Sequence, residues 1–302
     1  MRQWSQARGA CYRLLMATPA VLLLLANDAR GESSMAAPVA GAEYEISKSY
    51  ETSHRSNSGS SGSSRGRDTV LERVITVRED GLELEYDLPK GASAEDRARS
   101  WQFPVRVLRS TSGSMKLLNR PELEARVEAW LKTAGWTRAA CGTWIFTWNA
   151  FLIECNPESV IKTIEAFDLR YADLRDGASY REPESRGTGT LTRNEAGPKG
   201  ASFSVTLEID PSAVRRARAD SDVATGEILG KPVTLESALL ERAKERVSGT
   251  ISVSIDTDSA GSAYRRTKVT KLETEGPDGK SEAQTVTETV ERRTTTRASI
   301  LR

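Results

Sequence analysis

The stretch that decides the fold is residues 70–88, VLERVITVREDGLELEYDL. Its first part, residues 70–77, has the composition of a β-strand, and residues 82–88 alternate strictly between apolar and acidic side chains. The dipeptide Asp80-Gly81 stands between the two runs. Strand-like runs on both sides of Asp-Gly are the strongest short-range signal of a β-hairpin. The stretch therefore predicts a pair of antiparallel strands.

Further strands are predicted on either side of this hairpin. Residues 203–209 alternate between apolar and polar side chains, as a half-buried strand does. The segments 264–275 and 281–296 are long, polar and joined by a Gly-Pro-Asp-Gly turn. One register about that turn places Arg266 opposite Glu291, where opposite charges favour pairing. The remaining strands are predicted at 43–48, 104–108 and 251–255.

The helices are predicted from helical spacing and from signals at their ends. Asn119 precedes one helix as its N-cap, Glu122 completes a capping box, and Gly135 ends the helix. A second helix follows Asn156 and Pro157. Two more are predicted, a short arginine-rich helix after residue 210 and a helix between the Thr234 cap and Gly249.

One segment is predicted to lack regular structure. Residues 53–67 contain Ser, Gly, Arg, Asn and one His, with no apolar side chain. Such a composition cannot bury enough apolar surface to offset the entropy lost on ordering. We expect a mobile Ser/Gly-rich loop at 53–67.

The order of these elements and the modest hydrophobic content favour one fold class. Apolar residues make up 38% of the chain, and the mean hydropathy is −0.47. These values are typical of a thin core, as in a sheet with water on one face. The elements do not alternate strictly as in βαβ units. We expect one α+β domain, residues 32–302, with an antiparallel, curved, half-barrel-like sheet and packed helices.

The first thirty residues predict export from the cytoplasm. Three arginines precede an apolar run at 14–26, and Ala29-Arg30-Gly31 supplies small residues where a signal peptidase cleaves. Residues 1–31 therefore resemble a cleavable signal peptide. The run of about thirteen residues is short of the ~20 that a membrane-spanning helix needs, although an uncleaved anchor is the alternative. We expect a periplasmic or secreted protein without a transmembrane anchor after cleavage.

The balance of charges argues against one class of partner. The chain has 43 Lys and Arg residues against 42 Asp and Glu residues, and neither sign forms a stripe. A nucleic-acid-binding domain needs a basic face for the phosphate backbone. We therefore expect no nucleic acid among the partners.

The two cysteines left after cleavage bound the stretch CGTWIFTWNAFLIEC, residues 141–155. In one continuous helix they would stand ~21 Å apart at 1.5 Å per residue, whereas a disulfide needs Cα atoms within about 7 Å. A reversal near Trp148-Asn149 brings them together, and export permits oxidation. We predict a structural Cys141–Cys155 disulfide. A redox pair lacks its C-x-x-C spacing, and a zinc site lacks histidines.

Five of the six tryptophans fall between residues 101 and 148. An aromatic cluster of this kind can line a groove for a lipid tail, a glycan or a peptide. The alternative is that the large rings fill a core that is short of aliphatic residues. The candidate ligand-binding residues are Trp101, Trp130, Trp136, Trp144 and Trp148.

Catalytic chemistry is not indicated. Residues 62–66, GSSRG, match the G-x-S-x-G pattern of serine hydrolases. That nucleophile elbow needs a strand before it, a helix after it and a later histidine, whereas the sole histidine, His54, comes earlier. We predict no catalytic residue, no cofactor and no metal site. An enzyme that uses carboxylates alone stays as a third hypothesis.

The stretch from Thr250 to Glu291 combines a strand, an Asp/Gly turn, a long charged strand, a Gly-Pro-Asp-Gly turn and a Thr/Val strand. It resembles the C-terminal half of exported bacterial proteins with half-barrel sheets. These include uncharacterised envelope families and, more distantly, periplasmic lipoprotein carriers. The resemblance implies a curved sheet, and in the carriers the concave face holds acyl chains.

Two functional hypotheses follow. The first is a non-enzymatic binding module of the cell envelope, with a groove between sheet and helices for an apolar or amphipathic, lipid-like ligand. The second is a structural or protein-interaction subunit. Its long threonine-rich strands would pair with an envelope protein by strand addition.

Overall fold

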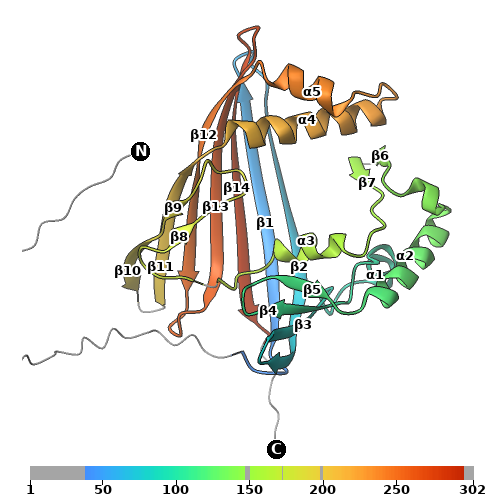
Figure 1. The fold of residues 1–302 in the computed structure, drawn as a ribbon, viewed down its shortest axis with the longest axis vertical. Coiled ribbons are helices and arrows are strands. Elements are labelled where there is room, and N and C mark those ends of the chain that lie inside the picture. Colours follow the sequence, from blue (N-terminus) through green and yellow to red (C-terminus); the bar gives the residue numbers. More distant parts are fainter. Residues whose placement is uncertain (1–37, 147–149, 172, 198–199, 296–302) are drawn as a thin grey trace, which may run out of the picture. The chain divides into compact units, whose positions relative to one another are not determined.

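The computed structural model describes residues 38–146, 150–171, 173–197 and 200–295, and all of them belong to one compact unit, Ser34–Arg302. The predicted signal peptide and Trp148 lie outside the described residues. Within them the predicted α+β class is confirmed. A curved, unclosed antiparallel sheet of ten strands is combined with five α-helices (Figure 1).

The sheet pairs strands from both ends of the chain. Its order is β10-β11-β12-β13-β14-β1-β2-β3-β4-β5, so the strand nearest the C-terminus lies beside the first strand. The strands are β1 (Glu43–Ser56), β2 (Ser61–Arg78), β3 (Gly81–Asp87), β4 (Val105–Ser110), β5 (Met115–Leu117), β10 (Thr192–Gly197), β11 (Gly200–Glu208), β12 (Arg246–Thr257), β13 (Ala263–Glu275) and β14 (Ser281–Thr294).

The hairpin predicted at residues 70–88 is confirmed as β2 and β3. The connecting residues are Glu79 and Asp80, while Gly81 is already the first residue of β3. A Cβ at Gly81 would lie 2.1 Å from the Arg109 carbonyl oxygen of β4. Glycine is therefore required here because the backbone of the next strand approaches closely.

The prediction of a mobile loop at 53–67 is wrong. Residues 53–56 belong to β1 and residues 61–67 to β2, and β1 is paired on its other side with β14. The backbone hydrogen bonds of two neighbouring strands hold this segment, so few apolar side chains are needed. The Tyr50 ring also covers Gly66 of β2, where a Cβ would lie 2.5 Å from it.

The register predicted for the two long C-terminal strands is off by one residue. Glu291 lies opposite Arg265, and Arg266 lies opposite Val290, because five residues separate the paired Glu275 and Ser281. Directly opposed residues share a face of the sheet. Arg266 faces the interior because its partner Val290 is buried.

Strand addition along the threonine-rich strands is excluded by the topology. The strand β13 is paired along its length with β12 and β14, and β14 is paired with β13 and β1. Neither strand has a free edge for another chain. This part of the second functional hypothesis is wrong.

Four of the five helices in the described residues lie in predicted regions, with different ends. The helix Ala94–Arg99 was not predicted, and the helix after residue 210, predicted to be short, has 18 residues. Gly135 ends its helix as predicted, with a φ of 72°. Asn119 makes no capping bond; its side chain instead bonds the backbone at Pro104 and Arg106. The helix predicted to reach Gly249 ends at Arg242. The helices are α1 (Ala94–Arg99), α2 (Arg120–Ala134), α3 (Ser159–Glu165), α4 (Pro211–Ile228) and α5 (Leu235–Arg242), with a 3₁₀ turn η1 (Arg138–Ala140).

Two apolar sectors flank a charged sector on the inner face of the sheet. One sector lies on β11 and β12 and the other on β1 to β4, and both belong to the buried core. Between them, the inward positions of β13 and β14 carry Arg266, Lys268, Glu288 and Arg292. The inner face is therefore not a continuous apolar surface. The apolar members are Phe203, Val205, Leu207, Ile251, Val253 and Ile255 in the first sector, and Ile46, Val70, Leu84, Tyr86, Val105 and Val107 in the second.

A buried carboxylate joins the sheet to the segment that follows α3. Glu72 is fully buried and accepts hydrogen bonds from Arg170 at 2.5 and 2.6 Å, from Arg292 at 2.8 Å and from the Tyr86 hydroxyl at 3.0 Å. Burial raises the pKa of a carboxyl, but the two guanidinium groups outweigh it and lower the pKa of Glu72 to about 2. Arg292 also stacks on the Tyr44 ring, 3.5 Å from its centroid.

A second ionic cluster holds the same segment further along the sheet. We call the segment after α3, residues 166–171 and 173–190, the covering segment. Glu182 is buried and accepts a hydrogen bond of 2.6 Å from the Tyr180 hydroxyl. Arg266 and Lys268 lie 3.9 and 4.0 Å from its carboxylate, and Lys268 is 2.8 Å from Glu288. Short strands β8 (Ser179–Tyr180) and β9 (Gly189–Thr190) lie in this segment. The chain thus covers part of its own inner face through ion pairs.

We predict that Glu72→Gln lowers the free energy of unfolding by about 3–5 kcal/mol, because two buried guanidinium groups lose their carboxylate. Urea unfolding followed by circular dichroism measures this change. In the control Glu85→Gln, which removes a partly exposed pair with Arg73, the loss should stay within about 1 kcal/mol. Equal losses in the two variants would contradict the large contribution to the free energy of unfolding that we assign to the Glu72 cluster.

The same carboxylate predicts a loss of stability in acid. Its pKa lies below the ordinary 4.5, at about 2, so the ionised form stabilises the folded state. The contribution of ionised Glu72 to the free energy of unfolding is complete above about pH 4.5 and is lost as the pH falls toward about 2. Urea unfolding across this range should show a steeper decline in the native protein than in Glu72→Gln. Parallel pH profiles would refute the assignment.

Candidate functional site

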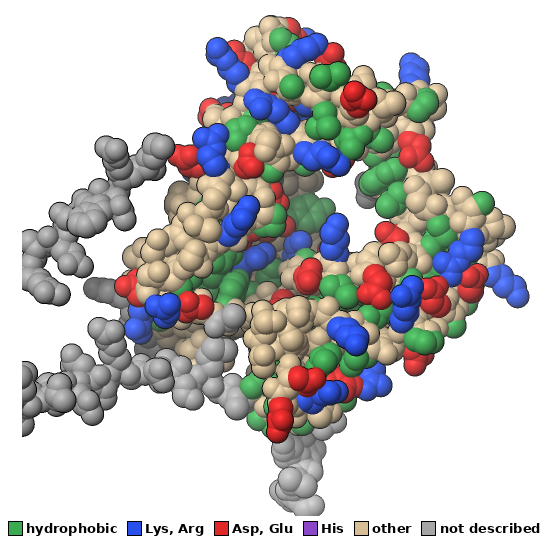
Figure 2. Space-filling model, viewed as in Figure 1, with side chains coloured by type: hydrophobic (Ala, Val, Ile, Leu, Met, Phe, Trp, Pro, Cys, Tyr) green, Lys and Arg blue, Asp and Glu red, His purple; other side chains and the backbone are tan. Residues whose placement is uncertain are grey.

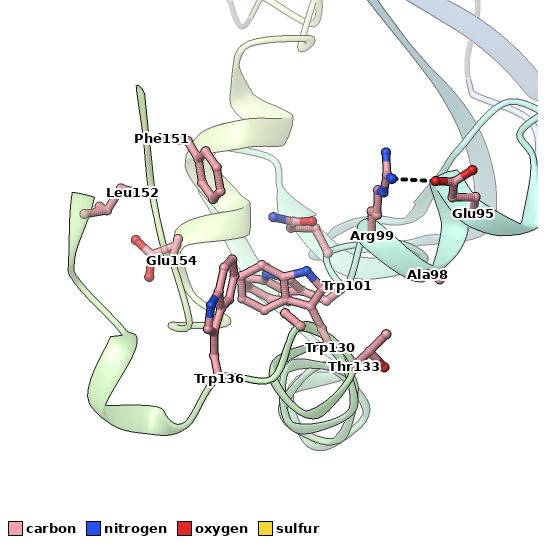
Figure 3. A pocket seen from close by; sticks show the side chains of 12 residues that line it. Glu95, Ala98, Arg99, Trp101, Trp130, Thr133, Trp136, Phe151, Leu152 and Glu154 are labelled. Carbon is pink, nitrogen blue, oxygen red and sulfur yellow. Dashed lines mark hydrogen bonds and ion pairs between the residues drawn. The ribbon is translucent and has the colours of Figure 1, made fainter. Parts of the chain in front are cut away.

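A pocket of about 650 Å³ lies between α1, α2 and the strand β7 (Ala150–Leu152). Figure 3 shows its walls, in which the indoles of Trp101, Trp130 and Trp136 gather below the Phe151 ring. Leu152 extends the apolar wall on the same strand as Phe151. The pocket is within the roughly 300–1,000 Å³ range of small-molecule sites, and its lining is mainly aromatic and aliphatic.

The end of α2 sets the angle between two of the indoles. Gly135 adopts a left-handed conformation, and the Trp136 N–H then bonds back to the Leu131 carbonyl at 2.9 Å. This type of helix ending reverses the chain direction at a glycine. The Trp136 ring consequently meets the Trp130 ring edge to face, with centroids 5.4 Å apart and planes at 78°.

Trp101 links the pocket to the core. It follows α1, whose start is fixed by a capping box between Ser93 and Asp96. Only 3% of Trp101 is exposed, and it belongs to the main hydrophobic core. Trp101 therefore serves both roles considered for the tryptophans, since it fills the core and lines the pocket.

The remaining wall is carried by a disulfide-linked hairpin. The predicted Cys141–Cys155 disulfide is confirmed, with Cα atoms 5.6 Å apart. Between the cysteines, β6 (Trp144–Phe146) pairs with β7, and the Gly142 N–H bonds the Ile153 carbonyl at 2.8 Å. The hairpin places the Phe151 ring 6.4 Å from that of Trp136.

Polar side chains lie around the aromatic walls. Arg99 of α1 is paired with Glu95 one turn earlier, as the dashed line in Figure 3 shows. Glu154, just beyond β7, accepts a hydrogen bond of 2.8 Å from the Asn156 N–H. Gln102 and Thr133 complete the polar part of the lining. The pocket therefore offers both apolar walls and polar groups to an amphipathic molecule.

Three of the five candidate tryptophans meet in the pocket, and Trp144 does not line it. The Trp144 backbone N–H instead bonds the Glu227 carboxylate of α4 at 3.0 Å and connects the hairpin to that helix. Trp148 lies outside the described residues.

The sequence did not indicate the other lining residues. Phe151 and Leu152 lie inside the stretch between the cysteines, so its apolar character was the only signal for them. Nothing in the local sequence distinguished Glu95 or Arg99 from other surface charges, because α1 was not predicted.

The location of the pocket differs from the groove expected between sheet and helices. Its walls come from α1, α2, Trp101 and the disulfide-linked hairpin, and none of the lining residues belongs to the ten-stranded sheet. Figure 2 shows the hollow beside the sheet, with apolar side chains inside it and Lys, Arg, Asp and Glu side chains around it. Along β13 and β14, inward-facing charged side chains interrupt the apolar surface of the sheet.

None of the helices in the described ranges is both long and apolar enough to span a membrane. In the same residues, no three His, Cys, Asp or Glu side chains are grouped as metal ligands would be.

Comparison with known proteins gives no family. No family model matches the sequence, and no curated protein matches it. Among solved structures, lipovitellin, in a structure of its lipid–protein interactions, matches 86% of this chain with 11% identity and a TM-score of 0.35, and this chain spans 26% of that one. Ail, the attachment invasion locus protein of Yersinia pestis, is matched over its full length and 84% of this chain, with 6% identity and a TM-score of 0.17. Neither similarity supports an inference about this protein.

We predict that removing the disulfide with Cys141→Ser and Cys155→Ser together lowers stability by about 3 kcal/mol, as expected for a loop of this length. Urea unfolding of the double variant and of the native protein measures the difference. Added reductant should destabilise the native protein to the same degree and leave the variant unchanged. A reductant effect on the variant would show that the loss has another origin.

Proposed function

We propose that this protein is a non-enzymatic binding module of the cell envelope that holds an apolar or amphipathic small molecule in the tryptophan pocket. The observation that carries the proposal is a cavity of about 650 Å³ that is lined by three indoles and is not filled by them. Aromatic side chains that only filled a core would be close-packed, with few voids larger than a water molecule.

The exposed part of the lining supports the same proposal. Phe151 and Leu152 are each 36% exposed in the described structure, although they are large and apolar. Apolar side chains gathered around a concavity are a recurrent mark of binding sites. A ligand in the pocket would remove these surfaces from water, at about 25 cal/mol per Å² of apolar area.

The disulfide supports the proposed location. Structural disulfides persist in oxidising compartments and are rare in the cytoplasm. Cys141–Cys155 therefore agrees with the export predicted from residues 1–31. We propose that the protein is periplasmic or secreted.

We predict that Trp136→Ala weakens binding of a neutral amphiphile by about ten-fold, since one aromatic wall is lost. Isothermal titration calorimetry with dodecyl maltoside below its micelle-forming concentration measures the affinity. The matched control is Trp144→Ala, which removes a partly buried indole that does not line the pocket, and its affinity should stay within about two-fold of the native value.

A second variant separates binding from folding. Ala98→Trp fills the pocket from α1 without removing a native wall, so it should abolish dodecyl maltoside binding and leave thermal unfolding near that of the native protein. Saturable binding that survives in Ala98→Trp would place the ligand elsewhere. Absence of binding by the native protein would remove the proposal.

A further inference from the structure

The pocket presents aromatic faces at steep angles to one another. The Trp130 and Trp136 planes meet at 78°, and the Phe151 ring is tilted by 46° to that of Trp136. The face of an aromatic ring is electrostatically negative. Faces that meet around one space attract a cation more strongly than an uncharged group of the same size, and tryptophan does so best.

The protein does not place a cation of its own over these faces. Within the described part of the chain, the cation–π contact is that of Arg292 with Tyr44, in the sheet. Arg99, the cation on the pocket lining, is held by Glu95 along α1. The indole surfaces that line the pocket therefore carry no cation from the described part of the chain.

The charged groups of the lining have a net negative balance. Two carboxylates, Glu95 and Glu154, face one guanidinium, that of Arg99. Arg99 is paired with Glu95, whereas no lysine or arginine among the described residues forms a salt bridge with Glu154. An anionic head group would meet an excess of negative charge here, and a cationic one would complement it.

We propose that the pocket selects an amphiphile with a quaternary ammonium head group. This inference rests on the proposed function and names its ligand class. A quaternary ammonium donates no classical hydrogen bond and is bound through the faces of aromatic rings, so it suits the aromatic walls of this pocket. The alkyl part lies against Leu152 and the aliphatic surface of α1 and α2, and Glu154 supplies the counter-charge.

The test compares three probes that share a twelve-carbon chain. Dodecyltrimethylammonium, dodecyl maltoside and dodecanoate are titrated by calorimetry below their micelle-forming concentrations. The cationic probe should bind the native protein about ten-fold more tightly than the neutral probe, and the anionic probe should bind most weakly of the three. Glu154→Gln keeps an oxygen for the Asn156 N–H and should weaken only the cationic probe, by about five-fold.

The matched control is Glu165→Gln, which removes one exposed charge from α3, outside the pocket. Its affinity for dodecyltrimethylammonium should equal that of the native protein, because a change in net charge alone is screened by salt. If all three probes bind with equal affinity, the head-group inference is overturned and the proposed function stands. If none of the three probes binds, the head-group inference and the proposed function are both contradicted. A preference for the cation that Glu165→Gln reduces as much as Glu154→Gln does would also overturn the inference, since it would reflect net charge.

Discussion

The structure depends on the buried carboxylate of Glu72 and on the two guanidinium groups that neutralise it. Through Arg292 the carboxylate joins β2 to β14, and through Arg170 it joins the sheet to the segment after α3. These partners lie 220 and 98 residues away along the chain. Burying the charge is costly unless every partner is in place, so the cluster specifies one arrangement of sheet and covering segment.

The sequence predicted the local structure better than the long-range pairing. The alternation in residues 82–88 and the glycine at 135 identified a strand and a helix end because these signals act within a few residues. The strand character of residues 53–67 could not be predicted from their composition, because it depends on the pairing of β1 with β2 and on the pairing of β1 with β14, more than two hundred residues away, as Ser53 and Thr285 show. The one-residue error in the register predicted for Arg266 has a similar origin, since a one-residue difference in turn length does not change the pattern of threonines and charges.

The candidate site was predictable in part for the same reason. The distance argument for Cys141 and Cys155 needs only chain geometry, and it identified the disulfide. The density of tryptophans indicated the region in which the pocket lies, but it could not separate Trp136, which lines the pocket, from Trp144, whose backbone contacts α4. That separation depends on the turn at Gly135 and on the fold of the hairpin. The rim charges depend on α1, a short helix with no buried residue and hence no apolar periodicity.

The position of the pocket reconciles a charged sheet with an apolar site. A concave sheet lined by charged residues is a poor surface for an apolar molecule, because its ion pairs would lose water or partners on contact. The chain instead covers part of that surface with residues after α3 and builds the apolar site from α1, α2 and a hairpin closed by Cys141–Cys155. The pocket wall at Phe151 is held by this covalent link and by the bond from Trp144 to Glu227. The ionic cluster of the sheet and the disulfide of the hairpin therefore act at different places: the first joins the sheet to the segment after α3, and the second holds the pocket wall at Phe151.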